Sequence, residues 1–192
     1  MVAHPNRSRM SVEEYLELDR SSPDTKYEYI DGEVYLMAGG SPAHARIAAT
    51  LIRELGFHLR GGPCDVYTSD VKVRVFGTDQ YLHPDITVSC DERDRQPEVE
   101  MLEYPCLVIE VLSPSTERID RHKKSNLYRA MPSIKEYVLV DSQEQAVEVY
   151  RRVENGFWWF SYFGPGDRVE LDSLGVTIPI EVIYERVTFS NA

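Results

Sequence analysis

A single glutamate, Glu110, stands inside the otherwise apolar run 107–112, whose length and composition are those of a buried strand. An unpaired carboxylate in a strand core costs several kcal/mol or more, so the folded chain must supply a compensating group. A metal ion shared with a second carboxylate is one of the few effective compensations. The pair Pro84-Asp85, 25 positions upstream, supplies that second candidate.

The composition is that of an ordinary globular protein, with 192 residues, 42% hydrophobic and 28% charged. No apolar stretch approaches the length of a membrane span, and no apolar block follows Arg7 and Arg9, so we expect neither a membrane segment nor a secretory signal. The three cysteines lack metal-site spacing, which predicts reduced thiols in a cytoplasmic protein: Cys64, Cys90 and Cys106.

The net charge of −11 opposes binding to nucleic acid, because such proteins usually present a basic surface. Positive charge is nevertheless concentrated in residues 118–129, which contain five Lys or Arg residues and His122 but a single acidic residue, Asp120. A basic helix on an acidic body can form a local binding groove. The alternative is an ordinary solvated helix face.

Capping and turn motifs place most elements. Ser11 with Glu14 forms a capping box, Ser41-Pro42 starts a second helix, and Asp31-Gly32 and Asn155-Gly156 are hairpin turns. Helices are expected at 12–20, 41–61 and 116–131, the last capped by Thr116. A further short helix is expected after Pro179. Strands are expected at 27–30, 33–37, 71–75, 81–89, 107–112, 134–140, 147–153, 157–163 and 176–178.

The central order of helix, three strands, helix and strand predicts a mixed sheet covered by helices. Alternation places Asp85 with Thr87 on one strand face and Glu110 with Val108 on another. If the two strands are neighbours in suitable register, both carboxylates can hold Mg²⁺, whose bound water can attack a phosphodiester. Lys124, on the following helix, can stabilise the developing charge, although it can also simply pair with Asp120.

These residues occur in blocks whose combination resembles the Uma family of endonucleases, within the restriction-endonuclease-like PD-(D/E)xK superfamily. The resemblance covers about residues 12–150. The blocks are Tyr27-Glu28 with Asp31-Gly32-Glu33, Ser41 with His44, Pro84-Asp85, residues 107–116, Asp120 with Lys124, Tyr128, and residues 136–141.

The resemblance implies an α/β (α+β) fold: a restriction-endonuclease-like mixed β-sheet with an αβββαβ core flanked by helices, plus N- and C-terminal hairpins. It also implies dependence on Mg²⁺, with Mn²⁺ as a substitute, and cleavage of phosphodiester bonds. We expect one domain over 1–192. Its parts are an N-terminal helix and hairpin at 10–40, a nuclease-like core at 41–141, and a C-terminal hairpin and short helix at 142–192.

The resemblance assigns the two acidic metal-ligand positions to Asp85 and Glu110, and a backbone carbonyl ligand to Val111. The superfamily lysine belongs two residues after the glutamate, where this chain has Leu112. The lysine is therefore expected from the following helix, as Lys124, with Lys123 as the neighbouring alternative.

Two further residues are possible members of the site. Glu28 can add a third carboxylate, although an exposed residue beside a hairpin is the plainer interpretation. His44, in the first turn of a helix, can face a substrate phosphate or can simply be partly buried in a hydrogen bond. The aromatic run 157–160 can stack on bases, but structural cover is the favoured interpretation.

The favoured function is therefore a Mg²⁺-dependent endonuclease acting on nucleic acid, with DNA preferred as substrate and Asp85, Glu110 and Lys124 as catalytic residues. One alternative is a non-catalytic module that binds nucleic acid or protein. Another is a structural domain in which Glu110 and Lys124 form a buried ion pair. A homodimer is expected by analogy, because two-fold symmetry suits cleavage of both strands of a duplex.

Overall fold

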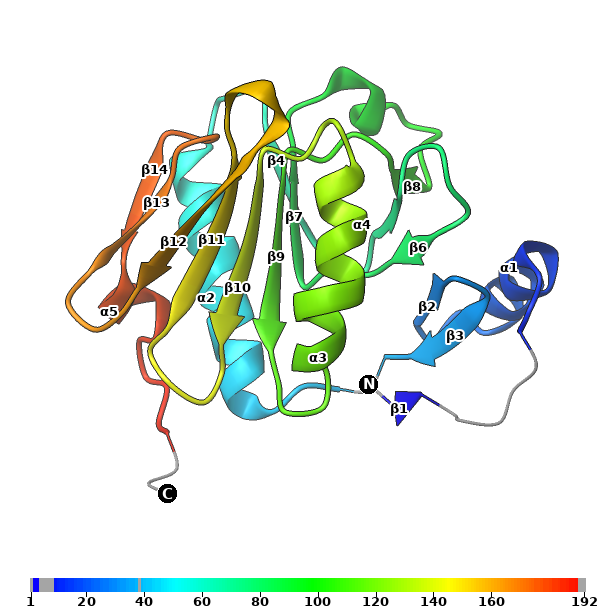
Figure 1. Ribbon diagram of the computed structural model, residues 1–192, viewed down its shortest axis with the longest axis horizontal. Coiled ribbons are helices and arrows are strands. Elements are labelled where there is room, and N and C mark those ends of the chain that lie inside the picture. The colour runs from blue at the N-terminus through cyan, green and yellow to red at the C-terminus, as the bar shows by residue number, and fades with distance from the viewer. Residues whose placement is uncertain (1, 4–8, 38, 190–192) are drawn as a thin grey trace.

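The computed structural model describes residues 2–3, 9–37 and 39–189, and Figure 1 shows their arrangement. Within these residues the strands form two six-stranded sheets and one two-stranded ribbon. The core sheet has the order β12-β11-β10-β9-β7-β4. Its strands are β4 (Asp65–Thr68), β7 (Ile86–Ser89), β9 (Leu107–Leu112), β10 (Glu136–Asp141), β11 (Val147–Arg152) and β12 (Trp158–Phe163).

Helices cover both faces of the core sheet. Helix α2 (Pro42–His58) lies on one face, and a helical segment made of α3 (Glu117–Ile119), η2 (Asp120–Lys124) and α4 (Ser125–Ala130) lies on the other (Figure 1). Strands β9 and β10 are parallel and are joined by this helical segment, whereas β7 is antiparallel to both β4 and β9. The expected αβββαβ core and mixed sheet are therefore present.

The three strands of that core are not the three that were predicted. The predicted strand 71–75 is β5 (Lys72–Arg74), which belongs to the second sheet, and the first core strand is β4, which the prediction omitted. The predicted strand 81–89 is divided into β6 (Tyr81–Leu82) and β7. Pro84 explains the division, because proline cannot donate a ladder hydrogen bond and restricts the residue before it. The chain passes from one sheet to the other at this point.

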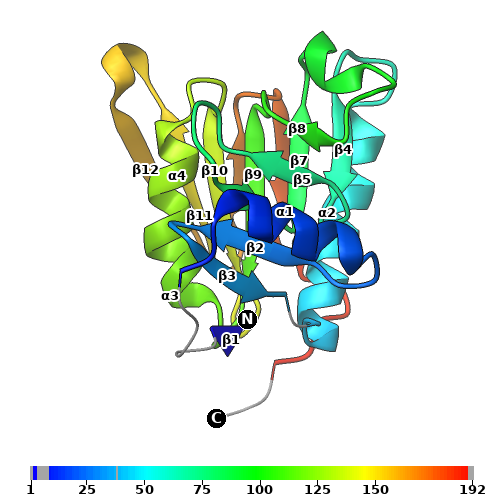
Figure 2. The same cartoon turned by 90° about the vertical axis from the view of Figure 1, so that its right-hand side faces the viewer.

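The second sheet has the order β1-β3-β2-β6-β5-β8 and contains the N-terminal hairpin. Its remaining strands are β1 (Val2–Ala3), β2 (Tyr27–Ile30), β3 (Glu33–Leu36) and β8 (Met101–Leu102). The predicted turn is confirmed, with φ of 52° at Asp31 and 82° at Gly32. Figure 2 shows this hairpin and α1 (Val12–Ser21) lying in front of the core sheet.

Tyrosines attach α1 to the second sheet. Tyr15 is fully buried, and its ring centroid lies 4.9 Å from that of Tyr29 and 5.2 Å from that of Tyr81. The capping box is confirmed, since Ser11 Oγ accepts from the Glu14 N–H and the Glu14 carboxylate accepts from the Ser11 N–H. A local motif thus starts the helix, and aromatic packing holds it in place.

The predicted helix 116–131 is present with a wider turn in its middle. At η2 the backbone adopts a π turn, in which the Ser125 N–H donates to the Asp120 carbonyl. The Thr116 side chain does not cap this helix; instead its hydroxyl accepts from the Ser113 N–H at 3.4 Å. Both Asp120 and Lys124 are buried at the π turn, whereas an exposed basic face was one alternative.

The C-terminal part completes the core sheet and packs a two-stranded ribbon and a short helix against α2. The β11–β12 hairpin turns through η3 (Glu154–Gly156), with positive φ at Asn155 and Gly156 as predicted. Strand β14 (Val176–Pro179) and helix α5 (Ile180–Ile183) are also as predicted, but β13 (Arg168–Leu171), the partner of β14, was not. A 3₁₀ turn, η1 (Glu92–Arg95), completes the elements.

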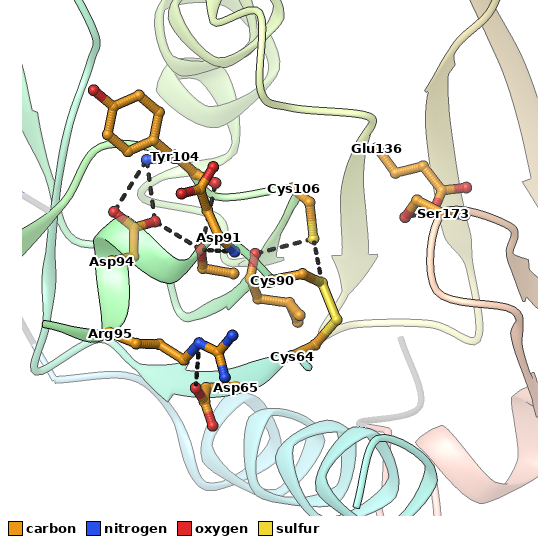
Figure 3. Close-up of a disulfide and its surroundings, with 12 residues drawn as sticks. Cys64, Asp65, Cys90, Asp91, Asp94, Arg95, Tyr104, Cys106, Glu136 and Ser173 are labelled. Atoms are coloured by element: carbon orange, nitrogen blue, oxygen red, sulfur yellow. Dashed lines mark hydrogen bonds and ion pairs between the residues drawn. A yellow bond between two sulfur atoms is a disulfide. The ribbon is translucent and has the colours of Figure 1, made fainter. Parts of the chain in front are cut away.

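The prediction of three reduced cysteines is wrong, because Cys64 and Cys90 form a disulfide (Figure 3). Asp65 lies opposite Ser89 in the antiparallel β4–β7 pair, so the residue before β4 lies opposite the residue after β7. Register between strands distant in sequence created this proximity, which cysteine spacing does not reveal. Among the described helices, none combines the length and apolar character that crossing a bilayer requires.

Candidate functional site

Asp85 and Glu110 lie on neighbouring strands in the register that the metal-site hypothesis required. Ile86 lies opposite Ile109 and Val88 opposite Leu107, so continuing the antiparallel pairing by one residue places Asp85 opposite Glu110. Opposite residues of an antiparallel pair project from the same face. Both carboxylates line one cavity of about 750 Å³.

The cavity is lined by the core sheet, by both helical layers and by the segments that flank the N-terminal hairpin, at Lys26 and Met37. Its floor includes Glu110 and Val111 of β9, and its walls include Lys124 and the first turn of α2. Its other polar lining residues are Asp24, Thr25, Lys26, Ser41, His44, Thr68, Ser69, Asp85, Ser113, Ser115, Thr116 and Asp120. A site of this construction depends on correct packing of the N-terminal hairpin against the core.

Asp85 is held by the backbone and by His44. Its Oδ2 atom accepts a hydrogen bond from the Val111 N–H at 2.8 Å and lies 3.2 Å from His44 Nε2. Ser41 caps α2 by accepting from the His44 N–H, which positions that histidine. Burial opposes the imidazolium, but the hydrogen bond to Asp85 and the negative charges of Asp85 and Asp120 together outweigh it, so the pKa of His44 is above its ordinary value. His44 therefore orients a candidate metal ligand.

Lys124 reaches the site and is surrounded by three carboxylates. Its Nζ lies 2.8 Å from Glu28 Oε1, 3.0 Å from Glu110 Oε1 and 3.2 Å from Asp120 Oδ1. Burial disfavours its charge, yet these carboxylates hold the pKa of Lys124 well above its ordinary value.

Lys123, the alternative, instead contacts the hairpin surface, where its Nζ donates to Glu33 and to the Tyr35 hydroxyl. The structure thus brings Lys124, and not its neighbour, to Glu110.

The interpretation of Glu28 as an exposed residue is wrong. Its side chain is fully buried, and Oε1 accepts from the His83 N–H at 2.9 Å as well as facing Lys124. Burial raises the pKa of Glu28 despite the attraction of Lys124. The second sheet packs this strand against the core, so the residue beside the turn faces inward. The Tyr27-Glu28 block of the family resemblance was the available signal.

Tyr128 is a site residue that the candidate set omitted. Its hydroxyl donates to Glu110 Oε1 at 3.0 Å, and its ring is fully buried. Asp120, Lys124 and Tyr128 recur at four-residue spacing, which places them on one side of the helical segment. That spacing was readable from the sequence. Tyr128 and Lys124 together fix the Glu110 carboxylate.

The site holds more negative than positive charge. The carboxylates of Glu28, Asp85, Glu110 and Asp120 share two basic partners, His44 and Lys124, and burial raises the pKa of Glu110 well above its ordinary value. Two buried oxygens, Glu28 Oε2 and Asp120 Oδ1, accept no hydrogen bond. Uncompensated buried charge is costly, so this donor set favours uptake of a cation or of protons.

The donor set suits a hard cation that retains water. In the described part of the chain, no three or more His, Cys, Asp or Glu side chains are arranged to hold a metal by themselves. Side-chain ligation would therefore be sparse, with backbone carbonyl and water oxygens completing the shell. Mg²⁺ is commonly bound in this way, through one or two carboxylates and several waters.

The aromatic run lies outside the site. Phe157, Trp159 and Phe160 are exposed, whereas Trp158 is partly covered by Arg152 and Arg129, whose guanidinium carbons lie 4.5 and 5.3 Å from its ring centroid. None of the four lines the cavity that contains Glu110. The structure therefore does not associate them with the candidate chemistry.

A family model and two relatives match this chain. The Uma2 family model, described as "Putative restriction endonuclease", matches residues 12–181. The "Uncharacterized protein slr1290" of Synechocystis sp. is 39% identical over 192 residues, which cover 98% of this chain and 100% of that protein. The "Uncharacterized protein sll1609" of the same organism is 30% identical over 150 residues, covering 78% and 84%.

A solved structure shows the same fold. The crystal structure of "a putative nuclease belonging to DUF820" from Anabaena variabilis matches with a TM-score of 0.77 and 21% identity, covering 93% of this chain and 99% of that one. The expected restriction-endonuclease-like fold is thereby confirmed.

Proposed function

The chain belongs to the Uma2 family, as the sequence resemblance predicted, and we propose that it is a metal-dependent endonuclease that hydrolyses phosphodiester bonds of DNA. The observation that carries the proposal is the placement of Asp85, Glu110 and Lys124 around one cavity. Their types match a nuclease site: two carboxylates for a metal and one cation for the charge that develops on phosphate. We propose that Lys124, 3.0 Å from Glu110, takes the role of the lysine that position 112 lacks.

In this proposal Asp85, Glu110 and the Val111 carbonyl hold Mg²⁺, and Mn²⁺ can replace it. When bound, the metal supplies an acidic water and neutralises charge on the phosphate. The excess of carboxylates and the buried oxygen Glu28 Oε2, which accepts no hydrogen bond, fit such a cation. Glu28 lies beside Lys124 and is proposed as an additional acidic group of the site.

Neighbouring residues hold the two proposed metal-binding carboxylates in fixed orientations. His44 and the Val111 N–H fix the Asp85 carboxylate from two directions. Lys124 and Tyr128 both contact Glu110 Oε1, which restrains its rotamer before any ligand binds. Restraint of this kind lowers the entropy that must be lost when the substrate is positioned.

The acidic surface shapes how the substrate binds. With a net charge of −11, the protein lacks a general attraction for the DNA backbone, so we propose that divalent cations support binding as well as chemistry. A two-fold dimer is also part of the proposal, because it would present one site to each strand of a duplex. Light scattering on the purified protein tests the dimer directly.

The structural alternative rests on one specific observation. Lys124 is already satisfied by carboxylates, so the same geometry can stabilise a fold that neither binds metal nor cleaves DNA. Calorimetric titration with MgCl₂ separates these cases. We expect binding by the wild type, loss of binding in Glu110→Gln and Asp85→Asn, and unchanged binding in the surface control Glu33→Gln. Equal heats in all four proteins would eliminate the metal site.

Cleavage is tested on plasmid DNA, single-stranded DNA and RNA with Mg²⁺ or Mn²⁺. We expect nicking or linearisation of DNA by the wild type and by Glu33→Gln, and none by Asp85→Asn. Persistent cleavage in Asp85→Asn would point to a contaminating enzyme and reject the assignment. Metal binding without cleavage of any substrate would favour the non-catalytic binding module.

A further inference from the structure

Three sulfur atoms gather at the end of the core sheet opposite to the candidate nuclease site. Asp85 precedes β7 and Cys90 follows it, so the length of this strand separates the two locations. Cys64 directly precedes β4, and Cys106 directly precedes β9. Figure 3 shows the Cys64–Cys90 disulfide with the Cys106 side chain directed toward it.

Strand pairing holds the third sulfur in place. Cys106 donates its N–H to the Val88 carbonyl at 2.9 Å, which fixes the start of β9 against β7. Its Sγ atom then lies 3.5 Å from Cys90 Sγ, and its thiol contacts the Val88 carbonyl at 3.3 Å. A disulfide bond is about 2.0 Å long, so a displacement of roughly 1.5 Å would convert this contact into a bond.

We propose that the cluster of Cys64, Cys90 and Cys106 is a thiol–disulfide exchange site, in which Cys106 attacks Cys90. The Cys106 thiol first loses its proton to hydroxide. An electron pair of the Cys106 thiolate forms the Cys106–Cys90 bond, the Cys64–Cys90 bond breaks, and its electron pair leaves on Cys64, which takes up a proton. One disulfide and one thiol exist before and after, so the step consumes neither oxidant nor reductant.

The site has its own access and electrostatics. A cavity of about 480 Å³ is lined by both Cys90 and Cys106, so hydroxide and small reagents can reach the sulfurs. Burial raises the pKa of Cys106, with Glu136 adding to this and Lys135 opposing it, and the charged residues Asp91, Arg93 and Glu103 also line the cavity. Only the thiolate attacks, so exchange accelerates as pH rises.

Exchange would move a covalent tether within the fold. The Cys64–Cys90 bond ties the connection between α2 and β4 to the end of β7, whereas a Cys90–Cys106 bond ties β7 to β9. Each bond joins the ends of two strands that are already paired, and the second bond releases the connection that follows α2. The two bonds exclude each other because both use Cys90.

Peptide mapping distinguishes the two bonds, because Lys72 and Arg74 separate the first two cysteines and Arg93 and Arg95 separate the last two. The wild type, purified without reductant, is kept without oxygen at pH 7 and pH 9, then blocked with N-ethylmaleimide and digested with trypsin. We expect both Cys64–Cys90 and Cys90–Cys106 linked peptides. The second should form roughly a hundredfold faster at pH 9, following the thiolate fraction.

Two variants complete the test. Cys106→Ser should contain only the Cys64–Cys90 bond, and Cys64→Ser should form Cys90–Cys106 when treated with oxidised glutathione. The proposal is overturned if the wild type shows only Cys64–Cys90 at both pH values, or if Cys64→Ser retains two free thiols. A Cys64–Cys106 linked peptide from the folded wild type would also overturn it, because that bond indicates random exchange through unfolding.

Discussion

Replacing Lys124 by methionine tests the electrostatic account of the site most directly. Methionine keeps much of the volume of the side chain but removes its charge, leaving Glu28, Glu110 and Asp120 without their shared partner. The side chains of all four residues are at most 3% exposed, so water replaces the charge of the ammonium poorly. Removing one member of a buried ion pair typically costs about 3–5 kcal/mol.

That loss is large against a total folding free energy of roughly 5–15 kcal/mol. We expect the free energy of unfolding of Lys124→Met to be at least about 3 kcal/mol below that of the wild type at pH 7, because the buried ion pair is broken. Burial already raises the carboxyl pKa values of Glu28 and Glu110 above their unfolded values. Lys124 opposes this rise, so without it the pKa values are higher still and the folded variant binds protons more readily than the folded wild type. The deficit should therefore shrink as the pH falls from 7 to 5.

The measurement is urea unfolding followed by circular dichroism at pH 7 and pH 5. Lys123→Met is the matched control, since its ion pair with Glu33 is exposed and worth at most about 1 kcal/mol. A loss in Lys124→Met no larger than that of Lys123→Met would refute the reasoning. A deficit that grows on acidification would refute it equally, because the sign of the linkage would be wrong.

Three further predictions concern single side chains. Burial lowers the pKa of His83 to about 4. The free energy of unfolding should therefore fall by about 3 kcal/mol as the pH drops from 6.5 to 4, because the unfolded state takes up the proton first. His83→Gln should remove this part of the acid sensitivity of the urea midpoint. Tyr128→Phe should weaken Mg²⁺ binding in calorimetry, because Glu110 loses one of its two restraints, and an unchanged affinity would exclude a positioning role. Glu136→Gln should cost about 2 kcal/mol or more, because the buried carboxylate accepts from Arg151 and from backbone N–H groups, and Mg²⁺ binding should remain as in the wild type.

Local motifs were predictable because a few neighbouring residues determine them. The capping box at Ser11, the turn at Asp31-Gly32 and the start of α2 at Ser41 all have the predicted form. The position of Glu110 was informative for a different reason: burying its charge is so costly that a partner had to exist. A metal shared with Asp85 was the favoured partner, and an ion pair with Lys124 was one alternative. In the structure Lys124 Nζ lies 3.0 Å from Glu110 Oε1.

Long-range pairing explains what the sequence did not reveal. The short strand β4 has partly exposed residues throughout, so it lacks the alternation that identifies a half-buried strand. The burial of Glu28 depends on the second sheet packing against the core, and the disulfide depends on register between β4 and β7. Tyr128 differs from these cases, because its helical spacing from Lys124 was readable and its hydroxyl gave a reason to examine it.

The crossing of the chain between sheets at Pro84 has a consequence for how the protein acquires its site. Glu28 comes from the N-terminal hairpin and Glu110 from the core sheet, so the complete set of acidic groups exists only after both sheets have docked. A truncated chain beginning at Ser41 would retain every strand of the core sheet but would leave Lys124 with one fewer carboxylate. Metal affinity would then report how far the two sheets have docked, because a metal that binds only the docked state stabilises that state by mass action.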